Sequence, residues 1–146
     1  MAFTPQTTTY DFDQVTVALG PIIIDGFQDG EGVTIEPGAE TFTHVVGTDG
    51  KVTRSKTLNR TATVTIKLMQ SSAANDLLSA LHVVDRDAPN GAGVVTLFIR
   101  DDSGRALYKA SEAWISSPPS VTFDREATAR EWIISCSKLE RVDGGN

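Results

Sequence analysis

Within residues 60–69, RTATVTIKLM, polar and apolar side chains alternate without a break from Thr61 to Leu68. Successive side chains of a β-strand point to opposite faces, so this run predicts a strand with one dry face and one wet face. Such a strand needs a sheet and a core on one side only. The predicted dry face holds Ala62, Val64, Ile66 and Leu68, and the wet face holds Thr61, Thr63, Thr65 and Lys67.

Short alternating or apolar segments separated by turn residues recur along the chain, which predicts about eight or nine strands in all. The other candidates are 15–19, 22–27, 32–36, 41–46, 94–101, 105–111, 120–126 and 130–139. Asp49-Gly50 is a strong hairpin turn signal. Neither a linker nor an internal repeat interrupts the sequence, so we expect one domain over residues 1–146.

One segment, SSAANDLLSALHVVD, has the pattern of a helix, which we expect near residues 72–84. Ser71 or Ser72 is suited to cap its N-terminus. An apolar stripe at positions i, i+3, i+4 and i+7 predicts that the helix covers the dry side of a sheet. The stripe consists of Ala74, Leu77, Leu78 and Leu81.

Charge is unevenly distributed along the sequence. Residues 1–50 contain eight acids and neither Lys nor Arg, whereas residues 51–67 contain five bases and no acid. The net charge of −6 argues against tight, nonspecific DNA binding. A molecule with one acidic and one basic patch attracts copies of itself head to tail.

The sequence offers little for catalysis, cofactors or metals. The isolated histidines, His44 and His82, lack zinc-ligand spacing, and the single cysteine, Cys136, excludes an internal disulfide. The acidic loop at Asp25 and Asp29 does not match a calcium-binding spacing. We therefore expect no enzyme activity, no cofactor and no metal. Neither a secretory signal nor a membrane span is expected, so the protein is expected to be made in the cytosol.

Three stretches in a fixed order resemble the tail tube protein of contractile-tailed, myovirus-like bacteriophages. They are YDFDQVTVALG, then IIIDGFQDGEGVTIE, then GTDGKVTRSKTLNRTATVTIKLMQSSAANDLLSAL. The most telling parts are Gly47-x-Asp49-Gly50 followed by Arg54-Ser55, the Thr-rich strand ending in Leu68, and the helix start at Ser71. The resemblance covers roughly residues 10 to 82.

This resemblance implies a mainly β fold, a β-sandwich or partial barrel flanked by one α-helix. It implies a structural virion protein that forms hexameric rings, which stack into the inner tail tube and conduct genomic DNA during ejection. The implied partners are other copies of the chain, the tail sheath protein, the tape measure protein, and baseplate and terminator proteins. The implied location is the phage tail, after synthesis in the host bacterial cytoplasm.

We hypothesise that residues 47–60 form an extended hairpin or loop that docks on an adjacent subunit, in the next ring. The candidate basic contacts are Lys51, Arg54, Lys56 and Arg60, and the candidate acidic acceptors are Asp25, Asp29, Glu31 and Glu36. A second hypothesis is a net negative bore that repels DNA phosphates, supplied by carboxylates of the first 40 residues.

Other readings remain open from the sequence. A tail terminator, a baseplate component, or the tube of a secretion system or tailocin has the same general character, but a terminator stops at one ring. A ligand-binding β-sandwich needs an exposed aromatic platform, for which the sequence offers only two Trp and two Tyr.

Overall fold

The structure is a computed structural model that describes residues 7–145. Within this range it has ten strands, one short 3-10 helix (η1, Phe12–Gln14) and one α-helix (α1, Ala74–Asp87). The fold is therefore mainly β with one helix, as the sequence predicted. The strands are β1 (Val15–Leu19), β2 (Ile22–Ile24), β3 (Val33–Pro37), β4 (Phe42–Val46), β5 (Val52–Lys56), β6 (Ala62–Met69), β7 (Val95–Asp101), β8 (Leu107–Ser117), β9 (Ala129–Cys136) and β10 (Leu139–Val142).

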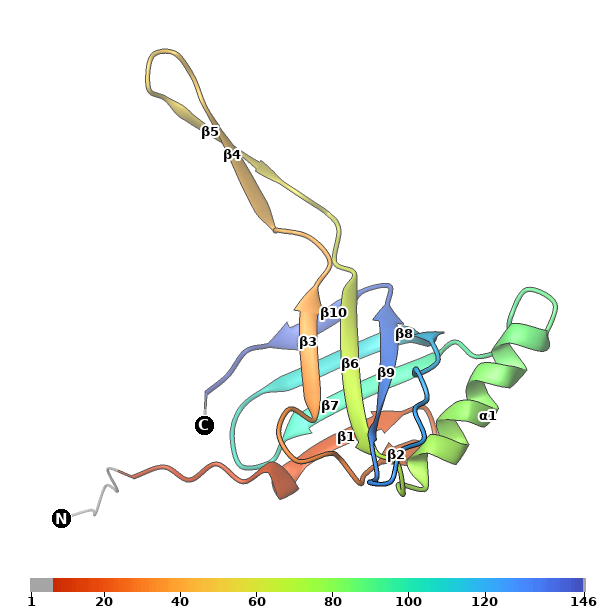
Figure 1. The fold of residues 1–146 in the computed structure, drawn as a ribbon. Coiled ribbons are helices and arrows are strands. Elements are labelled where there is room, and N and C mark those ends of the chain that lie inside the picture. The colour runs from red at the N-terminus through yellow and green to blue at the C-terminus, as the bar shows by residue number, and fades with distance from the viewer. Residues whose placement is uncertain (1–6, 146) are drawn as a thin grey trace.

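Eight strands form one antiparallel sheet that folds over at β8. The order is β2-β1-β7-β8-β9-β6-β3, and β10 also pairs with β8. The first part of β8 pairs with β7 and β10, and its last part pairs with β9 across a register shift between Ile115 and Ser117. A shift of this kind bends a strand. The strands β1, β7 and β8 thus form one layer, which crosses a second layer of β9, β6 and β3 (Figure 1).

The core lies between these two layers. Strand β6 alternates buried and half-buried residues along its whole length, which confirms the predicted dry and wet faces. Its buried side meets the inward residues of β1 and β7 from the opposite layer, such as Val17 and Leu97. Fully burying such side chains stabilises the fold by about 1.5–3 kcal/mol each.

Helix α1 lies at one end of the layers and packs against β2 (Figure 1). The predicted stripe was too wide, because Ala74 and Leu78 are buried but Leu77 is 51% exposed. The Ser72 hydroxyl accepts a hydrogen bond from the Ala74 N–H (3.3 Å) and donates one to the Asp25 carbonyl (2.7 Å). It therefore joins the helix start to the end of β2.

The Asn75 side chain fixes the helix against the sheet. Its Nδ2 donates to the backbone carbonyls of Met69 and Ser72 at 2.9 and 3.1 Å. Its Oδ1 accepts from Nε1 of Trp132 at 2.9 Å, and Trp132 is only 3% exposed. The indole is thus a core group and offers no platform for a ligand.

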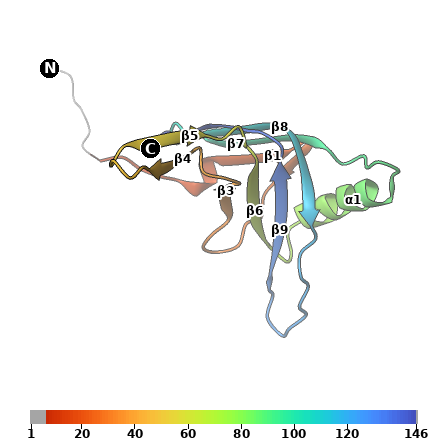
Figure 2. The same ribbon diagram turned by 90° about the horizontal axis from the view of Figure 1, so that it is seen from above.

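Three strand predictions were wrong in detail. Residues 120–126 form no strand, because they follow Pro118-Pro119 and belong to a loop that projects from the body between β8 and β9 (Figure 2). The predicted segment 130–139 is divided, so that its last residue begins β10. The predicted strand 105–111 continues to Ser117. The expectation of one domain over 1–146 stays a prediction, and residues 1–6 and 146 lie outside the described part.

Candidate assembly surfaces

Strands β4 and β5 form a separate two-stranded hairpin that extends away from the body (Figure 1). The hairpin lies in the chain between β3 and β6, and every residue of both strands is exposed. It begins earlier than the predicted segment 47–60, because β4 is its first arm. An isolated two-stranded hairpin is at best marginally stable in water, so this arm is a candidate for packing against another molecule.

A tight turn at Gly47–Lys51 closes the tip of the hairpin. The Gly47 N–H donates to the Lys51 carbonyl (2.8 Å), and the Lys51 N–H donates to a carboxylate oxygen of Asp49 (3.1 Å). Gly50 has a φ of +84°, a conformation that glycine adopts without strain. The Asp49-Gly50 signal therefore marks the turn.

The register separates the hairpin into two faces. Phe42 lies opposite Lys56, His44 opposite Arg54, and Val46 opposite Val52, and directly opposed residues share a face. The Arg54 guanidinium lies 4.1 Å from the centre of the Phe42 ring, a cation–π contact on that face. We call this the basic-apolar face. The opposite face carries Thr43, Val45, Thr53 and Ser55.

The exposed apolar residues of the hairpin were not among the residues singled out from the sequence. Val45, Val46 and Val52 are 70%, 59% and 62% exposed. The alternation of polar and apolar residues predicts a strand with one buried face, but it does not reveal that this strand lies outside the core. The turn signal together with the length of chain between β3 and β6 was the available clue.

The predicted basic residues are not brought into one cluster. Lys51 lies at the tip, 3.9 Å from Asp49, while Arg54 and Lys56 lie on β5. Arg60 lies outside the hairpin, at the root where β6 begins. The positive charge therefore follows the length of the arm.

The predicted acidic acceptors lie on the body. Asp25 follows β2, Asp29 and Glu31 lie in the loop before β3, and Glu36 lies on β3. Glu31 already has a partner in its own chain, since its carboxylate lies 3.6 Å from the Lys67 ammonium. Both groups remain partly exposed, so this ion pair contributes about 0–1 kcal/mol. The role of these residues in contacts between subunits stays a prediction.

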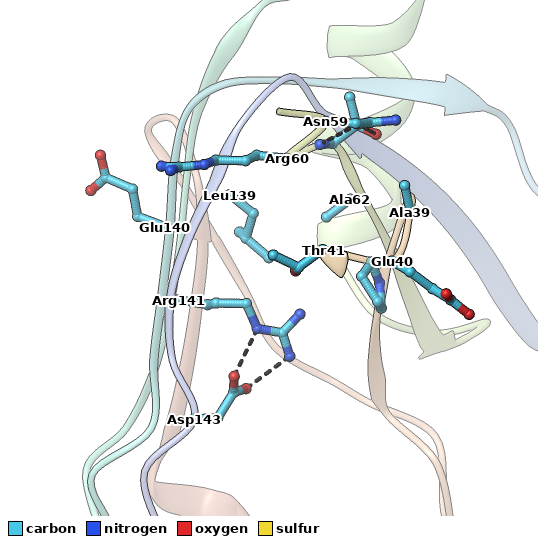
Figure 3. A pocket seen from close by; sticks show the side chains of 12 residues that line it. Ala39, Glu40, Thr41, Asn59, Arg60, Ala62, Leu139, Glu140, Arg141 and Asp143 are labelled. Atoms are coloured by element: carbon cyan, nitrogen blue, oxygen red, sulfur yellow. Dashed lines mark hydrogen bonds and ion pairs between the residues drawn. The ribbon is translucent and has the colours of Figure 1, made fainter. Parts of the chain in front are cut away.

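A cleft of about 740 Å³ lies at the root of the hairpin, between residues 37–41, residues 59–62 and β10 (Figure 3). On its wall the Arg141 guanidinium binds the Asp143 carboxylate through two hydrogen bonds, at 2.8 and 2.9 Å. Tyr108 donates a third hydrogen bond to Asp143 (2.8 Å). The hydrogen bonds from Arg141 and then Tyr108 lower the pKa of the Asp143 carboxyl. Burial, followed by the bond to Asp143, raises the pKa of the Tyr108 phenol.

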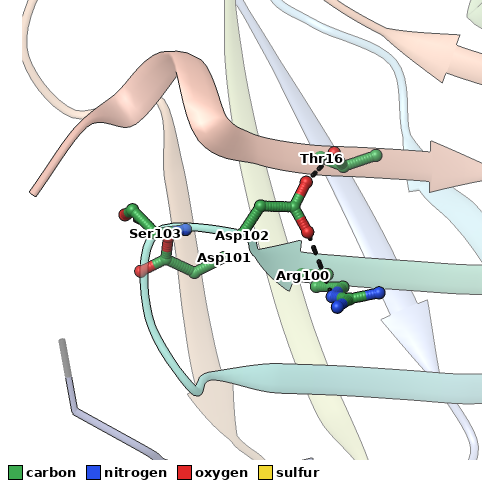
Figure 4. A network of polar contacts seen from close by, with 5 residues as sticks. All are labelled: Thr16, Arg100, Asp101, Asp102 and Ser103. Atoms are coloured by element: carbon green, nitrogen blue, oxygen red, sulfur yellow. Dashed lines mark hydrogen bonds and ion pairs between the residues drawn. The ribbon is translucent and has the colours of Figure 1, made fainter.

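A second polar group lies at the turn between β7 and β8 (Figure 4). The Arg100 guanidinium and the Thr16 hydroxyl both contact the Asp102 carboxylate, at 3.0 and 3.4 Å. The Asp102 N–H donates to the Gln14 carbonyl (2.9 Å). These contacts hold the start of β1 against the turn, so their role is structural.

No group of three His, Cys, Asp or Glu side chains in residues 7–145 is placed to hold a metal ion. Cys136 is buried in the core, and burial raises the pKa of its thiol to about 11. None of the helices in this range is long and apolar enough to cross a membrane.

The fold is that of tubes and tube terminators in contractile injection systems. One similar solved structure is the sheath/tube terminator of the PVC extracellular contractile injection system, with a TM-score of 0.64 and 13% identity over 94% of this chain and 99% of that one. Another is the cap that terminates the tube of the anti-feeding prophage, with a TM-score of 0.60 and 10% identity over 97% and 95% of the two chains. The PVC sheath–tube complex gives a TM-score of 0.57 at 13% identity, over 92% and 91%.

Sequence similarity is more specific than this fold likeness. The family described as the bacteriophage PhiTE tail tube protein matches residues 8–144. A protein of Pseudomonas phage KPP10, described as structural protein ORF10, is 35% identical over 97% of this chain and 85% of its own length. This chain belongs to the PhiTE tail tube family of phage structural proteins.

Proposed function

We propose that this protein is the subunit of an inner tail tube, in which hexameric rings stack inside a contractile sheath. The family match supports a tube protein. The observation that carries the assembly proposal is the β4–β5 hairpin, an exposed arm that forms its own sheet apart from the body. Such an arm gains stability only when it packs on another surface.

The hairpin docks on a neighbouring copy, and its charge is complementary to that of the body. Lys51, Arg54 and Lys56 follow the arm, while Asp25, Asp29 and Glu31 lie in loops of the body. A contact between two different surfaces of identical subunits closes into rings or continues as a filament. Each exposed ion pair contributes about 0–1 kcal/mol, and repetition around a ring multiplies the effect.

The proposed lumen wall is the outward face of β3, β6 and β9. Their buried residues face the core, so the alternate residues face outward. Cross-strand register aligns Glu36 with Thr63 and Ser135, and Thr34 with Thr65 and Ile133. Lys67 lies opposite Glu131. This face is rich in hydroxyl groups and carries little net charge, so DNA phosphates find few cations to bind.

The bore we propose is therefore nearly neutral, and it differs from the net negative bore expected from the sequence. Of the acids in the first 40 residues, Glu36 lies on this face, whereas Asp25, Asp29 and Glu31 lie in loops. A neutral wall rich in hydroxyl groups serves the same purpose as an acidic wall. It offers DNA phosphates few cations, so DNA passes without specific binding.

A tube terminator is the second candidate, favoured by the two terminator structures among the fold relatives. A terminator forms one ring and prevents further stacking, whereas a tube protein polymerises. In either role the protein has no enzyme activity, belongs to the phage tail, and is made in the host bacterial cytoplasm. Its partners are its own copies, the sheath, the tape measure, and baseplate and terminator proteins.

Negative-stain electron microscopy of the purified protein, concentrated at low and at moderate salt, tests the proposal. Uniform hollow tubes or stacked rings support a tube subunit. Single rings that never stack support the terminator. Protein that stays monomeric even after addition of a baseplate or preformed tube ends contradicts both roles.

A further inference from the structure

The outward face of the β2–β1–β7–β8–β10 layer carries apolar residues in register. Ile23 lies beside Ala18, and Ala18 beside Phe98. On the same face, two residues further along β7 and β8, Leu107 lies beside Val142. Ile23 and Val142 are 71% and 55% exposed. We call these five residues the outer apolar face.

No other element covers the outer apolar face within the part of the chain that the structure describes. Seen from above, β1, β7 and β8 form one outer side of the molecule, while β6, β9 and α1 lie on the other (Figure 2). The hairpin points away from the body and does not cover the layer (Figure 1). Charged residues interrupt the apolar ones, with Lys109 beside Phe98 and Arg100 beside Leu107. Exposed apolar groups that are rimmed by polar residues mark interaction sites.

The charges around this face favour a basic partner. Arg100 is neutralised by Asp102 at 3.0 Å, and Lys109 lies directly opposite Glu140. Asp25 follows Ile23 by two residues at the sheet edge, and no base within residues 7–145 forms an ion pair with it. The face thus combines apolar surface with an unpaired carboxylate.

The hairpin has the complementary combination. Its basic-apolar face presents Phe42, Val46 and Val52 together with Arg54 and Lys56. The opposite hairpin face has one large apolar residue, Val45, and no charge. Only the basic-apolar face therefore matches both the apolar surface and the carboxylate of the body.

We infer that the outer apolar face is the docking site for the basic-apolar face of the hairpin from a second copy of this chain. Val46 and Val52 cover the row of Ile23 and Phe98, while the bases of β5 approach Asp25. The inference rests on the proposed self-assembly and adds to it the surface on which the arm binds. It predicts that apolar burial holds the arm in place and that charge selects its orientation.

Cysteine cross-linking between two variants tests this contact. Copies carrying Ile23→Cys are mixed with copies carrying Val46→Cys, assembled, and oxidised; native Cys136 is buried and does not compete. The matched control is Val45→Cys, because Val45 is similarly exposed on the other face of the hairpin. We expect at least fivefold more disulfide-linked dimer with Val46→Cys than with Val45→Cys. Equal yields, or none in assembled material, overturn the inference.

A second variant separates this inference from the proposed function. Ile23→Glu places a charge on an exposed position, so the monomer keeps its thermal unfolding midpoint while assembly is lost. Phe123→Glu is the control, since Phe123 is 81% exposed on the β8–β9 loop. Assembly of Ile23→Glu at the wild-type level refutes the docking site and leaves the tube proposal intact. Failure of the wild-type protein to assemble under any condition refutes both.

Discussion

Removal of the hairpin is predicted to abolish assembly without weakening the fold. The strands that flank it are already paired, with Pro37 opposite Ala62 and the Gly38 N–H bonded to the Thr61 carbonyl at 2.8 Å. Replacing residues 40–58 with Gly-Gly therefore closes a short turn between β3 and β6. Asn59 and Arg60 are retained, because the Arg60 carbonyl accepts a hydrogen bond from the Leu139 N–H at 3.0 Å.

The expected change in the free energy of unfolding follows from the length of the loop and from the burial of the deleted residues. The loop between Gly38 and Thr61 shortens from about 22 to about five residues, and its closure entropy becomes more favourable by about 1 kcal/mol. No residue of β4 or β5 is buried, so no core contact is lost. The deletion variant should thus be as stable as the wild type, or about 1 kcal/mol more stable.

Urea unfolding and electron microscopy together check this prediction. The expected result is an unchanged or slightly higher free energy of unfolding, together with loss of rings and tubes. A loss of more than about 2 kcal/mol would mean that the hairpin supports the monomer fold, in conflict with its exposure. Normal tubes without the hairpin would mean that the arm has no part in assembly.

Three further predictions concern charge, packing and pH. Lys51→Glu combined with Arg54→Glu should reduce assembly at physiological salt, as measured by sedimentation, with no change in the unfolding midpoint of the monomer; unchanged assembly would exclude a charge contribution. Asn75→Ala should lower the free energy of unfolding of the monomer, measured in urea, by about 2–4 kcal/mol, because the buried Trp132 N–H loses its acceptor and the backbone carbonyls lose the Asn75 donor. A loss below about 0.5 kcal/mol would contradict this role. Burial raises the pKa of the Cys136 thiol from 9.0 to about 11, so the thiol should stay unreactive toward a thiol reagent at pH 8 until the protein unfolds. Its contribution to the free energy of unfolding should be constant below pH 9 and decline as the pH rises toward 11, because the unfolded thiol loses its proton first.

Local patterns in the sequence were sufficient for β6, the hairpin turn and the helix. The alternation of residues 60–69 fixed both faces of β6, because periodicity reports burial directly. Asp49-Gly50 located the hairpin tip. The helix was recognised from its spacing, although Leu77 proved exposed because α1 buries only a narrow strip beside β2.

Features that depend on nonlocal pairing were not predictable. Residues 120–126 have the composition of a strand, but two prolines precede them and no neighbouring strand pairs with them. The extension of β8 to Ser117 depends on β9, which pairs with it from the other layer. Ile23, Phe98 and Val142 lie far apart in the sequence, and only the register of the sheet brings them onto one face.

The candidate contact residues illustrate the same limit. The charge asymmetry singled out Lys51, Arg54 and Lys56, and the structure adds that they lie on an exposed arm; their contacts with other subunits stay a prediction. The sequence did not reveal that Glu31 pairs with Lys67, because that contact joins a loop to a strand. The apolar partners of the bases on the hairpin also became visible only once the arm was seen to leave the core.

A cryo-EM reconstruction of the assembled protein is the most direct measurement. We predict stacked rings in which the β4–β5 hairpin of each copy packs on a neighbouring copy, while Thr63 and Thr65 face the bore. A reconstruction in which the hairpin projects freely into solvent, or in which it lines the bore while β6 faces outward, would contradict self-assembly through this arm.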